Sequence, residues 1–272
     1  MSDKKRLHQA TEAKDAGKQS EKAFIRLRMV GFCGVDETFT DETEYKWPEY
    51  IEWGVLFRPE LEGSKRFPKL EWVAQFVRDK KKLAAHLCST RCEQILNGDA
   101  TFVQKLFTEF GFKRFQINAT KANNFDSATL GPLNVSNLVE IARSLRDAEF
   151  IVQRNDETKP LWENLEQLPD VPSNISYLFD ASVGGGVVVS VFDKPANDHA
   201  KYGYAGGIKP ENVEEIVRAI ASKVPQHTSV WIDMESGIRE KESDDDFSSK
   251  KAWKVCEVIE NLRLQGIVQF ES

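Results

Sequence analysis

Two residues that can transfer protons stand at the ends of strand-like segments in this chain. Cys33 lies in GFCG, after an alternating apolar and polar run, and Asp180 directly follows the apolar run ISYLF. A thiolate can act as a general base where positive charge lowers its pKa, and a carboxyl group that keeps its proton can act as a general acid. For either residue alone, a packed thiol or a loop-capping carboxylate is the simpler interpretation. The elements that position the two residues must therefore decide between chemistry and packing.

Two glycine-containing turns form a second chemical feature. Gly206 and Gly207 separate a short aromatic run from a helical pattern of apolar residues over 213–220. Adjacent glycines let the backbone approach a ligand, and a helix behind them would offer unpaired N–H groups to a phosphate. A plain tight turn explains the two glycines equally well. Ser236 and Gly237 follow the next predicted strand, and two neighbouring loops of this kind can pool N–H groups on one anion, which favours a phosphate site.

The elements around these residues alternate between strand-like and helix-like patterns. Eight strand candidates occur, most of them separated by a helix or an insert of helical length: 24–30, 51–57, 83–87, 112–117, 150–152, 175–179, the run from Tyr202, and 229–234. Such alternation predicts a parallel sheet, and eight repeats predict a single-domain α/β protein with the (β/α)8 TIM-barrel fold over 23–272. An open doubly wound sheet is the alternative, but GFCGVDE lacks the glycine pattern expected after its first strand. The polar stretch 1–22 is expected to be a disordered tail.

In a barrel of this kind the chemistry lies at the carboxyl ends of the strands. Cys33, Asp180 and both glycine turns occupy such positions. The other polar residues expected there are Arg58, Arg66, His86, Ser89, Gln116, Asn118, Gln153, Arg154, Asp233 and Glu235. The predicted fold thus directs the proton-transfer residues and the anion-binding loops to one end of the molecule.

Composition excludes several classes of function. A net charge of −6 gives no basic surface for nucleic acid, and no apolar run is long enough to span a membrane. Four scattered cysteines are too few for a disulfide framework, and without an export signal they indicate a reducing cytoplasm. A metal site built from Cys88, Cys92 and His86 is not expected, so no metal or cofactor is predicted. The expected partner is a small molecule bound by a monomer or homodimer.

Several motifs, in the right order, resemble phosphoribosylanthranilate isomerase, a (β/α)8 enzyme of tryptophan biosynthesis. GFCGVDE is similar to that family's first-strand Lys-Ile-Cys-Gly signature, and SKRFPKLEWV to its Ser-x-Arg-Tyr segment. LAAHLCSTRCEQIL is similar to its third unit. YLFDAS matches the family's general-acid segment, AGGIKPENV its Ala-Gly-Gly-Leu-x-Pro-Glu-Asn-Val, and DMESGIRE its Asp-x-Ser-Ser-Gly-Val-Glu. The resemblance covers most of the chain after the tail.

The resemblance implies a cofactor-free Amadori rearrangement of N-(5-phosphoribosyl)anthranilate. Cys33 falls on the family's general base and Asp180 on its general acid. Arg66 falls on the arginine that holds the anthranilate carboxylate, while Asn118 occupies a substrate-binding position where the family has histidine. The phosphate would be held by the glycine-containing loops, at Gly185, Gly186, Gly206, Gly207, Ser236 and Gly237.

Departures from the family, besides Asn118 and the charged residues Arg26 and Arg28 of the first strand, keep other functions open. Gly31 replaces a lysine, Glu235 stands where the family often has serine, and the loop after the sixth strand reads VGGGVVVSVFDKP. An isomerase for a different sugar phosphate, or a barrel that binds a phosphorylated or acidic ligand without catalysis, is therefore an alternative. A Schiff-base aldolase is disfavoured, because Lys201 and Lys209 flank the seventh strand rather than ending it.

Overall fold

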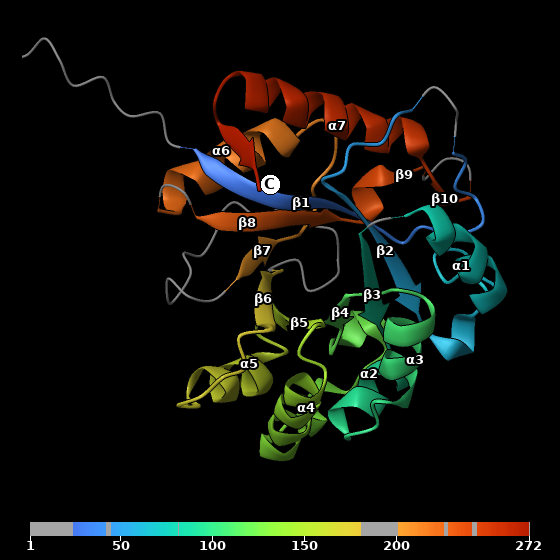
Figure 1. Cartoon of the computed structure of the whole chain (residues 1–272), viewed down its shortest axis with the longest axis vertical. Helices are drawn as coiled ribbons and strands as arrows, with labels where there is room; N and C mark the ends of the chain where they lie inside the picture. Colours follow the sequence, from blue (N-terminus) through green and yellow to red (C-terminus); the bar gives the residue numbers. More distant parts are fainter. Residues whose placement is uncertain are drawn as a thin grey trace, which may run out of the picture.

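Eight parallel strands close into a barrel, which confirms the predicted fold (Figure 1). The computed structural model describes residues 24–41, 45–80, 82–180, 201–225, 228–240 and 244–271. Neighbouring strands pair in chain order, and β1 also pairs with β8 to complete the ring. The strands are β1 Ile25–Cys33, β2 Ile51–Phe57, β3 Leu83–Leu87, β4 Arg114–Ile117, β5 Glu149–Arg154, β6 Ile175–Phe179, β7 Tyr202–Tyr204 and β8 Ser229–Met234.

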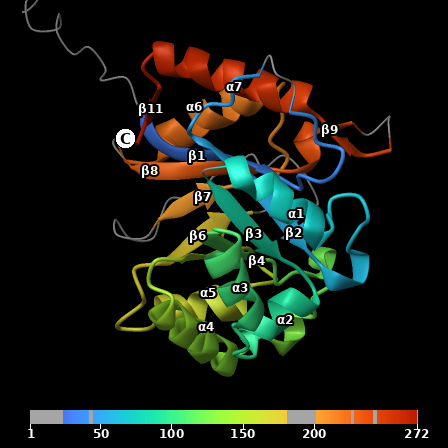
Figure 2. The same ribbon diagram turned by 45° about the vertical axis from the view of Figure 1, so that its right-hand side comes forward.

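Helices surround the barrel on its outside (Figures 1 and 2). They are α1 Leu70–Phe76, α2 Thr90–Leu96, α3 Thr101–Glu109, α4 Pro132–Ser144, α5 Lys159–Glu166, α6 Val213–Lys223 and α7 Ser249–Leu264. Short 3-10 turns are η1 Pro59–Leu61, η2 Val77–Asp79, η3 Lys121–Asn123, η4 Ser127–Thr129 and η5 Ser236–Ile238. The described residues between β1 and β2 contain no helix. Among the described helices, none combines the length and apolar character needed to cross a membrane.

Two hydrophobic clusters follow from the alternation of side chains along each strand. Outward residues such as Val30, Val152 and Ile232 join the large cluster against the helices. Inward residues form a separate small cluster inside the barrel, made of Met29, Ile151, Leu178 and Trp231. Because successive side chains of a strand point to opposite faces, the two clusters are the two sides of one sheet.

The first strand is longer and less regular than predicted. It continues through the GFC segment to Cys33 instead of ending at Val30, and its register with β8 shifts between Leu27 and Met29. The shift lets Leu27 pack outward and Met29 inward, although they are two residues apart. A bulge of this kind reverses the alternation. The apolar residues of the alternating pattern therefore point to both faces of the strand, Leu27 toward the helices and Met29 into the barrel.

Charged residues fill the end of the barrel at which the strands begin. Arg114 forms ion pairs with Glu52 and, at 3.2 Å, with Glu149, and Glu149 also binds Arg28 at 2.9 Å. The guanidinium of Arg114 lies 4.5 Å from the ring centroid of Trp231. These pairs give Arg28, an arginine of the first strand, a buried carboxylate as its partner.

Three further strands lie outside the barrel and are absent from the sequence-based prediction. The strand β11, Val268–Phe270, pairs in parallel with the first residues of β1. The short strands β9 Arg239–Glu240 and β10 Asp246–Phe247 form an antiparallel pair after β8. Arg239 anchors this pair, since its buried guanidinium binds Asp36 at 2.6 Å. The expected tail, 1–22, lies outside the described residues, as does part of the acidic stretch 240–246.

Candidate active site

A polar cavity of about 280 Å³ opens at the carboxyl ends of the strands. Every barrel strand or the loop that follows it contributes to the lining, as the predicted fold requires. The polar and glycine residues of the lining are Cys33, Arg58, Arg66, His86, Gln116, Asn118, Asn123, Gln153, Asp180, Gly206, Gly207, Asp233, Glu235, Ser236 and Gly237. The structure therefore brings together the described catalytic and binding residues that the resemblance implies, whereas Ser89 and Arg154, also expected at strand ends, do not line the cavity. Gly185 and Gly186 lie outside the described residues.

Cys33 lies against a histidine that the motif comparison does not assign. Its Sγ is 3.2 Å from Nδ1 of His86, which comes from β3, and both side chains are buried. Gly54 of β2 makes room for the contact, since a Cβ there would lie 3.0 Å from Nε2 of His86. Burial raises the pKa of the Cys33 thiol well above its usual value, reinforced by Asp233, and burial lowers the pKa of His86 to about 3. In the ligand-free molecule the pair is a neutral thiol beside a neutral imidazole.

Asp233 is the third member of this group. Its Oδ2 lies 3.9 Å from Nε2 of His86, and the carboxyl group fills the space above Gly31, where a Cβ would lie 2.5 Å from Oδ1. Burial raises the pKa of Asp233 to about 8, with a further contribution from the charge of Glu52. A side chain larger than that of glycine at position 31 would therefore collide with the carboxyl group of Asp233.

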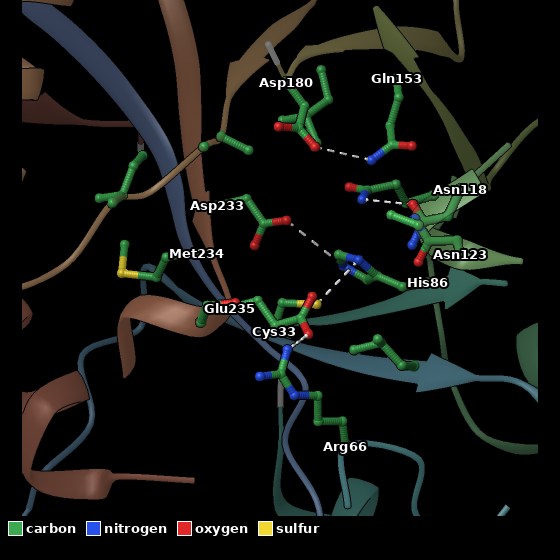
Figure 3. Close-up of a pocket in the computed structure, with 18 of the residues that line it drawn as sticks. Cys33, Arg66, His86, Asn118, Asn123, Gln153, Asp180, Asp233, Met234 and Glu235 are labelled. Carbon is green, nitrogen blue, oxygen red and sulfur yellow. Dashed lines mark hydrogen bonds and ion pairs between the residues drawn. The ribbon is translucent and has the colours of Figure 1, made fainter. Parts of the chain in front are cut away.

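Asp180 lies on the other side of the cavity from Cys33, with Asp233 and His86 between them (Figure 3). Its Oδ2 accepts a hydrogen bond of 3.3 Å from Nε2 of Gln153, at the carboxyl end of β5. The other end of that amide, Oε1 of Gln153, is buried and has no hydrogen-bond partner among the described residues. The cavity therefore presents a carboxyl group and an unsatisfied acceptor next to each other.

The two glycine turns meet at the cavity. Gly206 and Gly207 have φ angles of 111° and 63°, which favour glycine, and a Cβ on Gly237 would lie 1.9 Å from the carbonyl oxygen of Ile208. The loops after β7 and β8 thus pack backbone against backbone. The helix α6 begins at Val213, where the helical pattern predicts it, so its N-terminus is separated from the glycines by residues 208–212. The N–H groups of Gly206 and Gly207 are loop amides, and within the described chain they make no backbone hydrogen bond.

Arg66 reaches the cavity, but carboxylates already surround it. Its guanidinium binds Asp245 at 2.6 and 2.9 Å and Glu235 at 2.5 Å. The backbone N–H of Arg66 donates a hydrogen bond of 2.7 Å to Oδ2 of Asp36. This contact helps to hold Arg66 at its φ of 70°. The predicted anion-binding arginine is therefore present and fully paired.

Asn118, the other predicted substrate-binding residue, is also engaged within the protein. It accepts a 2.9 Å hydrogen bond from Gln116 and contacts Sγ of Cys88 at 3.4 Å. His86, Gln153 and Asp233 stand at predicted strand ends, but the sequence motifs assign them no role. The signal that could have singled them out is the pair of inward glycines, Gly31 and Gly54, because a missing side chain inside a barrel marks a close approach.

Comparisons with known proteins show a distant similarity. No family model matches the sequence, and no curated protein matches it significantly. The crystal structure of TrpF from Jonesia denitrificans is similar at a TM-score of 0.48 and 12% identity, covering 88% of this chain and 98% of that one. A DUF72 family protein from Enterococcus faecalis has a TM-score of 0.44 and 11% identity, covering 87% and 96%. TrpF is phosphoribosylanthranilate isomerase, the family that the sequence motifs resemble, and at this distance the similarity assigns no activity to the chain.

Proposed function

We propose that this barrel is an isomerase that moves protons on a phosphorylated sugar amine such as N-(5-phosphoribosyl)anthranilate. The observation that carries the proposal is the shared cavity of Cys33 and Asp180, which approach it from opposite sides of the barrel. A substrate between them would meet a thiol and imidazole on one side and a carboxyl group on the other. These are the two functions that a proton shift between neighbouring carbons requires.

Each step of the Amadori rearrangement has a candidate group in the cavity. Asp180 would donate a proton to the ring oxygen, and the ring would open to a Schiff base. Cys33, as a thiolate whose sulfur lies 3.2 Å from Nδ1 of His86, would remove the proton from C2. The resulting enol would become the ketone as this proton is returned to C1 and the C2 hydroxyl gives its proton to the carboxylate of Asp180, which regenerates both groups. No electrons leave the substrate, so the reaction balances without a redox cofactor.

The phosphate would be held by the loops after β7 and β8. Support comes from the left-handed backbone at Gly206 and Gly207 and from the close packing of Gly237 against Ile208. Backbone amides in such loops bind phosphate oxygens well. Ser236 would add a hydroxyl group, and Gly185 and Gly186 belong to the same proposal.

The pairing of Arg66 with Glu235 and Asp245 favours a second candidate, an isomerase for a sugar phosphate without an aromatic carboxylate. An anthranilate carboxylate would have to displace one of these partners to reach the guanidinium. A substrate that lacks this group leaves both ion pairs intact. The two candidates share the proton-transfer residues and the phosphate loops, and they differ only in what Arg66 does.

The leading candidate can be tested by complementation of a tryptophan auxotroph that lacks the isomerase. As part of the same proposal, the enzyme would act in the cytoplasm. The wild-type chain is expected to restore growth, while Cys33→Ala and Asp180→Asn each lower turnover about 10²- to 10⁴-fold. Cys256→Ala is the control, because this thiol is buried on α7 and does not line the cavity.

Growth that survives Cys33→Ala combined with Asp180→Ala would refute the mechanism. If the wild-type chain does not complement, binding of sugar phosphates measured by calorimetry decides between the alternatives. Binding that requires Gly206 and Ser236 supports the second candidate, and no binding rules out a phosphate-dependent enzyme.

A further inference from the structure

Cys33, His86 and Asp233 bring a thiol, an imidazole and a carboxyl group together at one point. One ligand atom from each residue lies within 4.8 Å of the others, and all three side chains are buried. They come from three different strands, β1, β3 and β8, so their meeting depends on the closure of the barrel. Figure 3 shows them as a group at the centre of the cavity wall.

The ligand atoms of this group lie near the spacing of ligands around a tetrahedral cation. Sγ of Cys33 lies 3.2 Å from Nδ1 of His86 and Oδ2 of Asp233 lies 3.9 Å from Nε2 of His86, and with one atom taken from each residue the three lie within 4.8 Å of one another. Bonds of about 2.3 Å to sulfur and about 2.0–2.1 Å to nitrogen and oxygen separate tetrahedral zinc ligands by about 3.3–3.6 Å. Because an ion binds only one ring nitrogen, side-chain rotations would have to bring Sγ, one nitrogen of His86 and one oxygen of Asp233 from within 4.8 Å of one another to this spacing. Thiolate and imidazole select zinc over magnesium and calcium, which prefer oxygen.

Gly31 and Gly54 have no side chains, and this leaves the space that Cys33, His86 and Asp233 occupy. A Cβ on Gly31 would lie 2.5 Å from Oδ1 of Asp233, and a Cβ on Gly54 would lie 3.2 Å from Cβ of Cys33. A larger residue at position 54 would push Cys33 and His86 apart, and a larger residue at position 31 would displace Asp233. The convergence is therefore built into β1 and β2 and does not depend on a chance rotamer.

The surroundings of the group also suit a cation. Both arginines of the lining have carboxylate partners: Arg66 is paired with Glu235 and Asp245, and Nε of Arg58 lies 3.8 Å from Glu60. Asp180 adds a further carboxyl group across the cavity. Oε1 of Gln153, 3% exposed and without a partner among the described residues, is an acceptor for a water molecule or hydroxyl group in the cavity.

We propose that Cys33, His86 and Asp233 form a three-ligand zinc site whose fourth position opens into the cavity. Three protein ligands with one open position are typical of catalytic zinc rather than structural zinc. The proposal does not depend on the isomerase reaction. A bound ion would withdraw the sulfur of Cys33 from proton transfer, so zinc occupancy and isomerisation by the proposed mechanism exclude each other.

Cobalt substitution tests the site without any substrate. The full chain, stripped with a chelator, is titrated with Co²⁺ and followed by absorption spectroscopy. We expect one equivalent to bind, with a near-ultraviolet sulfur-to-cobalt charge-transfer band and intense visible bands of tetrahedral cobalt. Zinc should displace the cobalt and abolish both. Cys33→Ser should remove the charge-transfer band, and His86→Ala and Asp233→Asn should each weaken cobalt binding at least tenfold.

Cys92→Ser is the matched control, because Cys92 is a buried thiol on α2 outside the cavity and its loss should leave the spectrum unchanged. Circular dichroism of each variant shows that it has folded. A charge-transfer band that survives Cys33→Ser, an octahedral spectrum, or no binding by the folded wild-type chain would overturn the proposal. Failure of the isomerase assay with metal-free protein leaves these results unaffected, so the two proposals can fail separately.

Discussion

Glu235 illustrates how one side chain can change what an anion site accepts. It precedes Ser236 in the loop after β8, and its carboxylate is bound to Arg66. The ion pair lowers the repulsion between Glu235 and a bound phosphate, but it also occupies the cation that an anionic substrate would use. Exposed fractions of 26% for Arg66 and 33% for Glu235 leave the pair accessible to a competing anion.

Glu235→Ser should strengthen the binding of inorganic phosphate. The substitution removes a negative charge from the cavity and releases Arg66, and about 1 kcal/mol of relieved repulsion corresponds to a roughly fivefold gain in affinity. Calorimetry at low ionic strength measures the change. Asp245→Asn is the control, since Asp245 also pairs with Arg66 but does not line the cavity. An equal gain from both substitutions would show that releasing Arg66, not relieving repulsion, is responsible.

The residues of the site divide into those that sequence can place and those that need the fold. Cys33, Asp180 and the glycine turns could be placed because strand ends converge in a barrel. The contact between Cys33 and His86 could not, since it depends on the register of β1 and β3 across β2. The partners of Arg66 depend on a loop some 180 residues further along the chain.

At the scale of elements, the short strand β7 shows how tightly the barrel interior is filled. Gly203 is its central residue, and a Cβ there would lie 2.0 Å from Cε2 of Trp231 on the neighbouring strand. Trp231 is 1% exposed and has no room to withdraw. Gly203 weakens the strand pattern in the sequence, but its lack of a side chain leaves the space that Trp231 fills.

Gly203→Ala should destabilise the folded protein by about 1–3 kcal/mol, because overpacking a rigid interior forces side chains away from their preferred rotamers. The free energy of unfolding in urea measures the loss. Gly131→Ala provides the comparison, since nothing lies within 4 Å of a Cβ at that position, and it should cost no more than about 1 kcal/mol. Equal losses from the two variants would contradict the packing explanation.

The periodicity of the sequence locates the barrel strands and most helices but misses the irregular elements. Alternation along β1 suggests one face, whereas the bulge beside Arg28 divides it between two. The short pair of β9 and β10 carries almost no pattern of its own, and its position is fixed by the distant contact of Arg239 with Asp36. Such elements depend on tertiary contacts, which local sequence patterns do not contain.

At the scale of the whole molecule, the barrel has a charged cluster at one end and the reactive cavity at the other. Glu149 lies at the centre of the cluster, bound to Arg28, Arg114 and Ser176. Burial alone would raise the pKa of Glu149, but the charge of Arg114, followed by Arg28, holds it below its usual value. A carboxylate with a lowered pKa contributes stability above its unfolded pKa, about 4.3, and that stability is lost as the pH falls toward the folded pKa.

Glu149→Gln should therefore cost about 3–5 kcal/mol of stability at pH 7, because two arginines lose a buried partner. The difference between wild type and variant should shrink as the pH falls from 5 to 3, where wild-type Glu149 loses its advantage. Urea unfolding at several pH values measures this narrowing. Glu163→Gln, on the exposed side of α5, should show no such trend. A difference that stays constant with pH would assign the stabilisation to packing rather than charge.

The pairing of β1 also dictates when the barrel can be completed. Its first residues take β8 and β11 as partners, and its later residues take β8 and β2. During synthesis the first described strand therefore cannot complete its pairing until the last described segments have emerged. Contacts between such distant parts of a chain close slowly. Cys33, the proposed base, lies at the end of β1. It can contact His86 once β3 is in place, but Asp233 joins them only when β8 pairs with β1 and the ring closes.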